Sequence, residues 1–180
     1  YDSIHCLCNA HHLRELERAW EHDQQKWAKN LKKLLEKMNT STKDAGGALP
    51  KADIQKYIKQ YRKILKIGEK ECPLAPKEEG KRGRQKQSKS RNLLTRLRDY
   101  EDDILRFMKI EIVPFTNNMA ENDIRMTKVQ QKVSGCFRSM NGAKYFCRIR
   151  SFLLTCKKNN ISRAQALREL FEGKLPSFMD

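Results

Sequence analysis

The sequence predicts a mainly α-helical fold. In several long segments the apolar residues recur at steps of three and four, which places them on one face of a helix. Only eight Gly and five Pro occur in 180 residues, and their clustering disfavours a sandwich of many short strands. Because 38% of the residues are apolar and 33% are charged, the core must be assembled from amphipathic helices.

The first half of the chain carries two amphipathic stripes. The first runs over residues 10–38 and predicts one continuous helix, with Asn9 as an N-cap whose side chain accepts a hydrogen bond from the first turn. The segment 39–50 contains a Gly-Gly pair and predicts a loop. A second stripe over 54–68 predicts the next helix, which the prolines that follow prevent from continuing.

A flexible basic linker is expected at about 74–90. The stretch from Lys77 to Ser90 contains no large apolar residue, so no burial offsets the entropy of ordering it. Residues 77–98 hold nine Lys and Arg against two Glu. The linker is therefore either a solvated tether or a segment that contacts DNA phosphates without reading the base sequence.

Four further helices are predicted after the linker. Stripes over 90–108 and 142–158 predict two of them. Thr116 is expected to cap another, which extends to about residue 133. A capping-box pattern at 162–165 opens a last short helix that ends at a glycine.

The net charge of +16 favours a polyanionic partner, of which nucleic acid is the commonest. No run approaches the ~18 apolar residues that a membrane span needs, and the first residues do not form a signal peptide. We therefore expect neither a membrane protein nor a secreted precursor. The six cysteines are irregularly spaced and are expected to be reduced thiols of a cytoplasmic protein.

The helix expected after Thr116 carries a carboxylate within a row of cations. Glu121 lies within about 60° of three basic residues at 100° per residue, and these are Arg125, Lys128 and Lys132. A separate apolar stripe is expected to be buried, and it consists of Met119, Met126, Val129 and Val133. Two interpretations stay open: a Glu121–Arg125 ion pair on a solvated face, or a metal-ligating carboxylate flanked by phosphate-binding side chains.

Residues 114–126, PFTNNMAENDIRM, closely resemble the signature of the insertion-sequence-66 family of transposases. The resemblance continues through KVQQKVSGCFRS at 128–139 and reaches residue 151. A second block, CNAHHLREL at 8–16, is similar to the family's segment just before its helical insertion. Residues 17–109 show only the helical character expected of that insertion.

The resemblance implies that the chain is the C-terminal part of a ribonuclease-H-like α/β core that carries a large all-helical insertion. Residues 1–14 would end the first part of the core, and 15–113 would form the insertion with its basic linker. Residues 114–160 would be core-closing helices that contain the catalytic glutamate. Residues 161–180 would form a C-terminal helix and tail.

In this family two aspartates and a glutamate hold two divalent metal ions for DNA strand cleavage and transfer. Acidic oxygen ligands suit Mg²⁺, and Mn²⁺ would substitute for it. By the match, Glu121 is the catalytic and metal-binding glutamate. The implied phosphate contacts are Arg125, Lys128, Lys132, Arg138 and Arg148. The implied supporting residues are Asn117, Asn118, His11 and Arg14.

Two departures from the family pattern are visible. Asn122 stands where the family has Arg, which removes a cation beside the carboxylate. The two aspartates would precede the block at 8–16 by more residues than this chain has, so the chain alone is expected to be inactive. The implied partner is DNA, both transposon ends and target, in the bacterial cytoplasm at the nucleoid. A homo-oligomer is expected in the transposition complex.

The sequence also allows two other interpretations, a zinc site and a non-enzymatic binding module. Cysteines and histidines gather near the start of the chain, and they are His5, Cys6, Cys8, His11 and His12. Zinc is unlikely there, because structural sites use wider cysteine spacing with a second pair downstream. The alternative function is a non-enzymatic basic helical module that binds nucleic acid without a metal.

Overall fold

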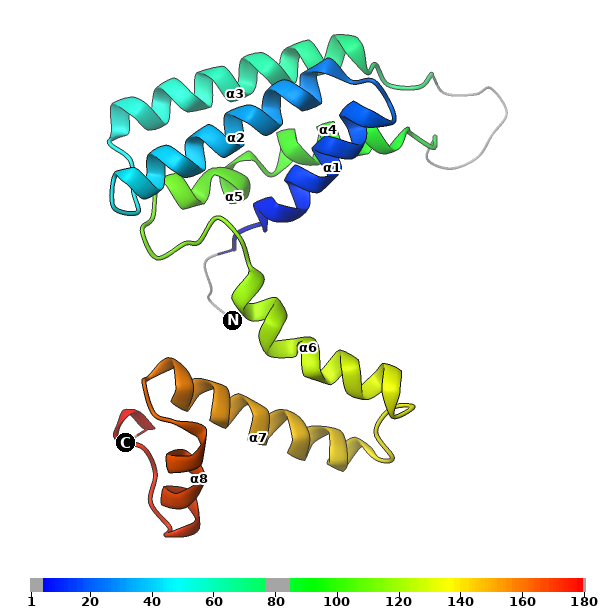
Figure 1. Ribbon diagram of the computed structural model, residues 1–180. Helices are drawn as coiled ribbons and strands as arrows, with labels where there is room; N and C mark the ends of the chain where they lie inside the picture. The colour runs from blue at the N-terminus through cyan, green and yellow to red at the C-terminus, as the bar shows by residue number, and fades with distance from the viewer. Residues whose placement is uncertain (1–4, 77–84, 180) are drawn as a thin grey trace. The chain divides into compact units, whose positions relative to one another are not determined.

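The computed structural model describes residues 5–76 and 85–179, and within these residues all regular structure is helical (Figure 1). The prediction of a mainly α fold is thus confirmed. The chain divides into two compact units, residues 1–117 and 118–180. Residues 77–84 of the linker expected at about 74–90 lie outside the described residues, and its last two residues, Lys89 and Ser90, are already part of a helix. The helices of the first unit are α1 (Asn9–Glu21), α2 (Lys26–Asp44), α3 (Lys51–Glu71), α4 (Lys89–Asp99) and α5 (Glu101–Leu105).

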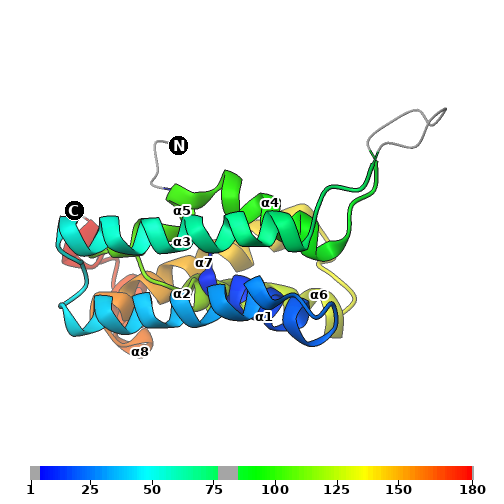
Figure 2. The same ribbon diagram turned by 90° about the horizontal axis from the view of Figure 1, so that it is seen from above.

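The first unit is built around four helices that enclose one core. Helix α1 packs against α2 and α4, and α3 packs against the same two helices (Figures 1 and 2). The fully buried side chains at its centre include Leu16, Trp27, Leu31, Leu35, Tyr61 and Leu97. The amphipathic stripes read from the sequence therefore supply this core. A short 3₁₀ turn, Arg106–Met108, closes it after α5.

The helix predicted over 10–38 is wrong, because the chain reverses after Glu21. Gln24 adopts a positive φ of 54°, and the amide of Gln25 donates to the carbonyl of Ala19. The apolar stripe contains a gap of seven residues between Trp20 and Trp27. Seven residues are two helical turns, so the periodicity continues across a turn that contains neither Gly nor Pro. Trp27 is fully buried, while Trp20 is half-buried beneath the ammonium of Lys29, 4.2 Å from the ring centroid.

The prediction of Asn9 as an N-cap is also wrong. The cap position belongs to Cys8, and Asn9 is the first helical residue, with 1% of its surface exposed. Its side-chain amide donates to the carbonyl of Ile104 at 2.9 Å, and its backbone amide donates to the carbonyl of Phe115 at 3.1 Å. The Asn9 side chain thus serves a tertiary contact instead of the first turn of its own helix.

The helix predicted over 90–108 is interrupted at Tyr100. Helix α4 ends at Asp99, and α5 begins with three acidic residues, Glu101 to Asp103. Negative charge stabilises the N-terminus of a helix and destabilises its C-terminus, so this run favours a new start over a continuation. The two other helices of this unit extend beyond the sequence expectation, since α2 reaches Asp44 and α3 reaches Glu71.

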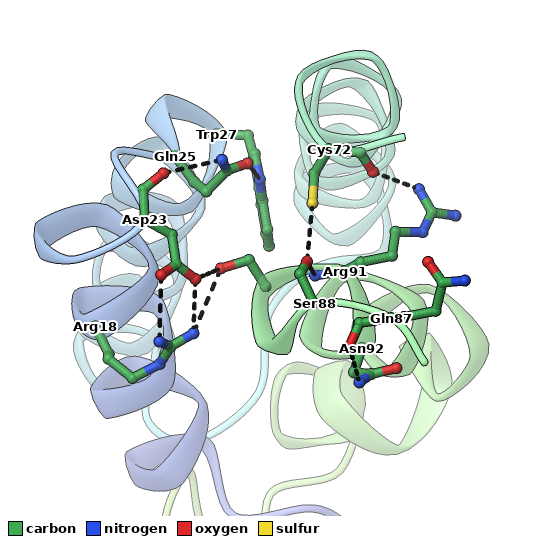
Figure 3. A network of polar contacts seen from close by, with 10 residues as sticks. Arg18, Asp23, Gln25, Trp27, Cys72, Gln87, Ser88, Arg91 and Asn92 are labelled. Atoms are coloured by element: carbon green, nitrogen blue, oxygen red, sulfur yellow. Dashed lines mark hydrogen bonds and ion pairs between the residues drawn. The ribbon is translucent and has the colours of Figure 1, made fainter. Parts of the chain in front are cut away.

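A polar network joins the turn after α1 to the start of α4 (Figure 3). Ser90 donates to Asp23 Oδ2 at 2.5 Å, and Arg18 donates to the same carboxylate at 2.9 Å. These hydrogen bonds lower the pKa of Asp23 below its ordinary value. On the other side of α4, the buried Arg91 donates to the carbonyl of Cys72 at 3.0 Å, at the end of α3. The network therefore fixes both ends of the segment between α3 and α4.

The second unit consists of α6 (Asn118–Val133), α7 (Met140–Lys158), α8 (Arg163–Phe171) and a 3₁₀ turn at Ser177–Met179. Helix α7 packs against both α6 and α8. Ser139 accepts from the amide of Gly142, and Ser162 accepts from the amide of Gln165, which confirms the predicted cap of the last helix. Helix α6 begins one residue later than expected from a Thr116 cap. No described helix is long and apolar enough to cross a membrane.

The prediction that α6 buries its Met and Val stripe is wrong for the described unit. Helix α6 has no buried residue, and Met119 and Val133 are 65% and 79% exposed. Within residues 118–179, α6 packs against α7 alone. One neighbouring helix cannot cover a stripe that is four turns long, so the apolar side chains stay accessible.

Candidate DNA-processing site

Glu121 lies in the first turn of α6. The free amides of a helix N-terminus give this turn a partial positive charge, so an acidic side chain stabilises the helix there. Arg125, Lys128 and Lys132 follow on the same side of the helix, within about 60° by helical geometry. They lie roughly 6, 10 and 16 Å along the axis from Glu121, at 1.5 Å per residue. The helix therefore presents one carboxylate at the head of a line of cations.

The five basic residues implied as phosphate contacts are accessible to a ligand. Arg125, Lys128, Lys132, Arg138 and Arg148 are all exposed. None of the five forms an ion pair with a carboxylate in the described part of the chain. Glu121 and Arg125 lie on the same side of α6, about 40° apart by helical geometry.

Asp123 is the acidic residue nearest to Glu121 in the sequence, but it serves a different purpose. Its carboxylate accepts from Lys158 Nζ at 2.5 Å and ties α6 to the end of α7. Two residues along a helix also turn Asp123 about 160° away from Glu121. The acidic side chains of 118–179 thus offer one carboxylate, Glu121, to the cationic face. One carboxylate fits a metal-binding position but does not by itself assemble a two-metal centre.

A second basic cluster surrounds the start of α7. Arg138 precedes the Ser139 cap, and Arg148 lies two turns inside the helix. The rings of Phe137 and Phe146 pack 5.3 Å apart and hold the α6–α7 turn against α7. The sequence predictions did not include this aromatic pair, although one Phe just after the Ser134-Gly135 break and another nine residues later would have suggested a turn clamped by its own side chains. The clamp gives Arg138 a defined place beside the helix N-terminus, where anions are favoured.

The two sequence blocks meet where the first unit begins and ends. The amide of Asn117 donates to Cys8 Sγ at 3.2 Å, and the amide of Leu7 donates to the carbonyl of Asp103 at 3.2 Å. Asn118 begins α6 directly after this contact and is exposed. Contacts between residues near both ends of the first unit therefore close its helices at their base.

His11 and Arg14 lie on the first two turns of α1, beside a shallow depression. Arg14 Nε donates to the carbonyl of Ala10 at 3.3 Å, within its own helix. His12 is buried, and its Nδ1 lies 3.4 Å from Asn9 Oδ1. Burial lowers the pKa of His12 to about 4, and the nearby charge of Arg96 acts in the same direction. His12 is therefore a neutral structural residue at physiological pH.

The cysteine and histidine residues near the start of the chain differ in their burial and in their partners. His5 Nδ1 lies 3.1 Å from Asp103 Oδ2, an interaction that directs this ring toward the end of the helical unit. Cys6 is exposed, whereas Cys8 is half-buried and accepts the Asn117 hydrogen bond. His5 and Cys8 thus each have a partner within the first unit.

Comparison with known proteins decides the family. The family model described as Transposase IS66 family matches residues 1–145. The chain belongs to the IS66 transposase family. The match covers the whole helical unit, α6 and the start of α7, so it includes Glu121 and all of the cations named above except Arg148. No curated protein and no solved structure in these comparisons matches the chain.

Membership of the IS66 transposase family confirms the resemblance seen in residues 8–16 and 114–139. It implies a role in transposition and therefore DNA as the partner. The roles of the individual residues are not decided by a family match and are argued below.

Proposed function

We propose that this chain supplies the metal-binding glutamate and the phosphate-binding cations of a DNA strand-cleaving site in an IS66 transposase. The observation that carries the proposal is the cationic face of α6. Glu121 lies in its first turn, and exposed cations follow that no described carboxylate neutralises. A polyanionic backbone bound along this face would reach the carboxylate at one end.

The chemistry follows from the residue types. When bound, a pair of divalent ions, Mg²⁺ or Mn²⁺, would activate the attacking oxygen and stabilise the leaving oxygen of a phosphoryl transfer. Glu121 would hold one position of that pair with its carboxylate. Arg125, with its planar fork of donors, suits the phosphate nearest the reaction. Lys128 and Lys132 would neutralise phosphates further along the strand.

The ligand set of this chain is incomplete in the proposal. Asp123 is paired with Lys158, and four aspartates of the helical unit pair with basic residues of that unit: Asp23, Asp99, Asp102 and Asp103. We therefore propose that two aspartates from outside this chain complete the metal site. The 180 residues alone would bind DNA but would not cleave it.

Replacement of Glu121 tests the proposal directly. In the full-length transposase, Glu121→Gln should abolish strand cleavage in Mg²⁺ and in Mn²⁺, because the amide does not replace an anionic metal ligand. DNA affinity should be unchanged. The matched control is Glu172→Gln, which removes an exposed carboxylate of the same unit that pairs with Lys174. Full cleavage by Glu121→Gln would exclude a catalytic role and leave the non-enzymatic basic module as the function.

A further inference from the structure

Helix α3 carries a row of lysines that the proposed site does not use. They recur at steps of three and four, and they are Lys56, Lys59, Lys63, Lys66 and Lys70. At 100° per residue these five side chains, here called the lysine stripe, fall within an arc of about 80°. Fourteen residues separate the first from the last, which is about 21 Å along the axis.

The lysine stripe lies opposite the core face of α3. Buried Tyr61 and Leu65 lie near the centre of the core face, about 180° from the middle of the stripe. All five lysines are exposed, and none pairs with a carboxylate among the described residues. Their alignment is therefore not required by packing.

The acidic residues of α3 leave the stripe uninterrupted. Glu69 accepts from Arg98 of α4 at 3.0 Å. Glu71 accepts from the amide of Trp27 at 3.0 Å, at the start of α2. Both carboxylates thus serve neighbouring helices. Asp53, the third acid, precedes the stripe and lies outside its arc.

Two lysines of the adjacent helix α2 have partners of their own. Lys32 pairs with Glu17 and approaches Glu36, and Lys29 covers the ring of Trp20. Like charges three and four residues apart repel each other on a helix. An unneutralised row of five is therefore unfavourable for the free protein and favourable once an anionic partner covers it.

We propose that the lysine stripe of α3 binds the phosphate backbone of duplex DNA, as a contact surface on the helical unit additional to α6. The choice of DNA rests on the proposed function, whereas the stripe itself does not depend on the role of Glu121. Its length spans about six phosphates of one strand at 3.4 Å each. Lysine ammonium groups contact phosphates and carry no base information, so the contact is independent of sequence. A membrane surface is disfavoured, because the apolar face of α3 is buried in the core.

The test removes three charges from the stripe and three from α2 in a matched control. The stripe variant is Lys59→Gln/Lys63→Gln/Lys66→Gln. The control variant is Lys33→Gln/Lys37→Gln/Lys43→Gln, which changes exposed lysines that share their helix with Glu36 and Asp44. Glutamine is a good helix former, so both variants should keep the helical circular dichroism of the parent chain.

Binding to a short mixed-sequence duplex is measured by fluorescence anisotropy over a range of salt concentrations. The stripe variant should lower the slope of log affinity against log salt by about 0.9 per lysine, roughly 2.7 in all. The control should leave that slope unchanged. An unchanged slope for the stripe variant, or an equal loss in both variants, would overturn the proposal. Cleavage by Glu121→Gln would reject the catalytic assignment alone, so the two failures are distinguishable.

Discussion

Replacing Gly68 with alanine should destabilise the first unit even though alanine is the better helix former. Gly68 lies inside α3, where alanine would gain about 1 kcal/mol from propensity alone. A Cβ at this position would stand 2.9 Å from Cγ and Cδ2 of the Trp27 indole and 2.9 Å from Leu94 Cδ1. Trp27 is fully buried, and its Nε1 donates to Gln25 Oε1 at 3.0 Å, so the ring has little freedom to move.

The magnitude follows from two opposing effects. Inserting a methyl group into a packed core costs about 1–3 kcal/mol, and the propensity gain offsets about 1 kcal/mol of that cost. Because the Trp27 ring is held in place, the packing cost should lie in the upper part of that range, and we expect Gly68→Ala to lower the free energy of unfolding by about 1–2 kcal/mol. Both tryptophans belong to the first unit, so urea unfolding followed by tryptophan fluorescence reports on this unit.

The control is Gln60→Ala, an exposed position of the same helix at which alanine meets no core atom. Its free energy of unfolding should change by less than about 0.5 kcal/mol. Unchanged or increased stability of Gly68→Ala would show that Trp27 can retreat from α3. The close approach of the glycine backbone to the indole would then not be a determinant of this core.

Two further predictions concern buried and networked polar groups of the first unit. Because the pKa of His12 is lowered to about 4 in the folded chain, stability should be full above pH 6.5 and should fall as the pH drops toward 4, by about 3 kcal/mol in total. His12→Gln should flatten this dependence in urea titrations, and an NMR titration midpoint near 6.5 would contradict the burial argument. Ser90→Ala removes a hydrogen bond to the Asp23 carboxylate and should cost about 1–2 kcal/mol, while the pKa of Asp23, followed by NMR, should rise. An unchanged Asp23 pKa would assign its lowering to Arg18 alone.

The helical fold was predictable because burial follows periodicity. The apolar residues of the stripe over 54–65 share one face, and α3 buries or half-buries each of them, whereas Ile67 is 41% exposed. The reversal after Glu21 was not predictable in the same way. The turn that makes this reversal is held by a hydrogen bond from Ser90 of α4 to Asp23, and these two residues are 67 positions apart in the sequence. Local spacing carries no information about such a partner.

At the candidate site, the arrangement of residues along one helix was predictable, whereas the burial and pairing of their side chains were not. The line of cations behind Glu121 follows from helical geometry alone, and the structure has α6 begin within two residues of the expected position. The burial of Met119 and Val133 failed as a prediction, because a stripe indicates which face is apolar but not whether a neighbour covers it. Asp123 illustrates the same limit, since its pairing with Lys158 depends on how α7 returns past α6.

The contacts that close the helical unit depend on two side chains near its start. Cys8 Sγ accepts from the backbone amide of Asn117, and the Asn9 side chain donates to the backbone carbonyl of Ile104, so the residue type matters at positions 8 and 9. The helices of residues 17–109 must only bury a core, and many apolar sequences do that equally well. This difference explains why residues 8–16 are recognisable one by one in the sequence, whereas residues 17–109 show mainly their periodicity.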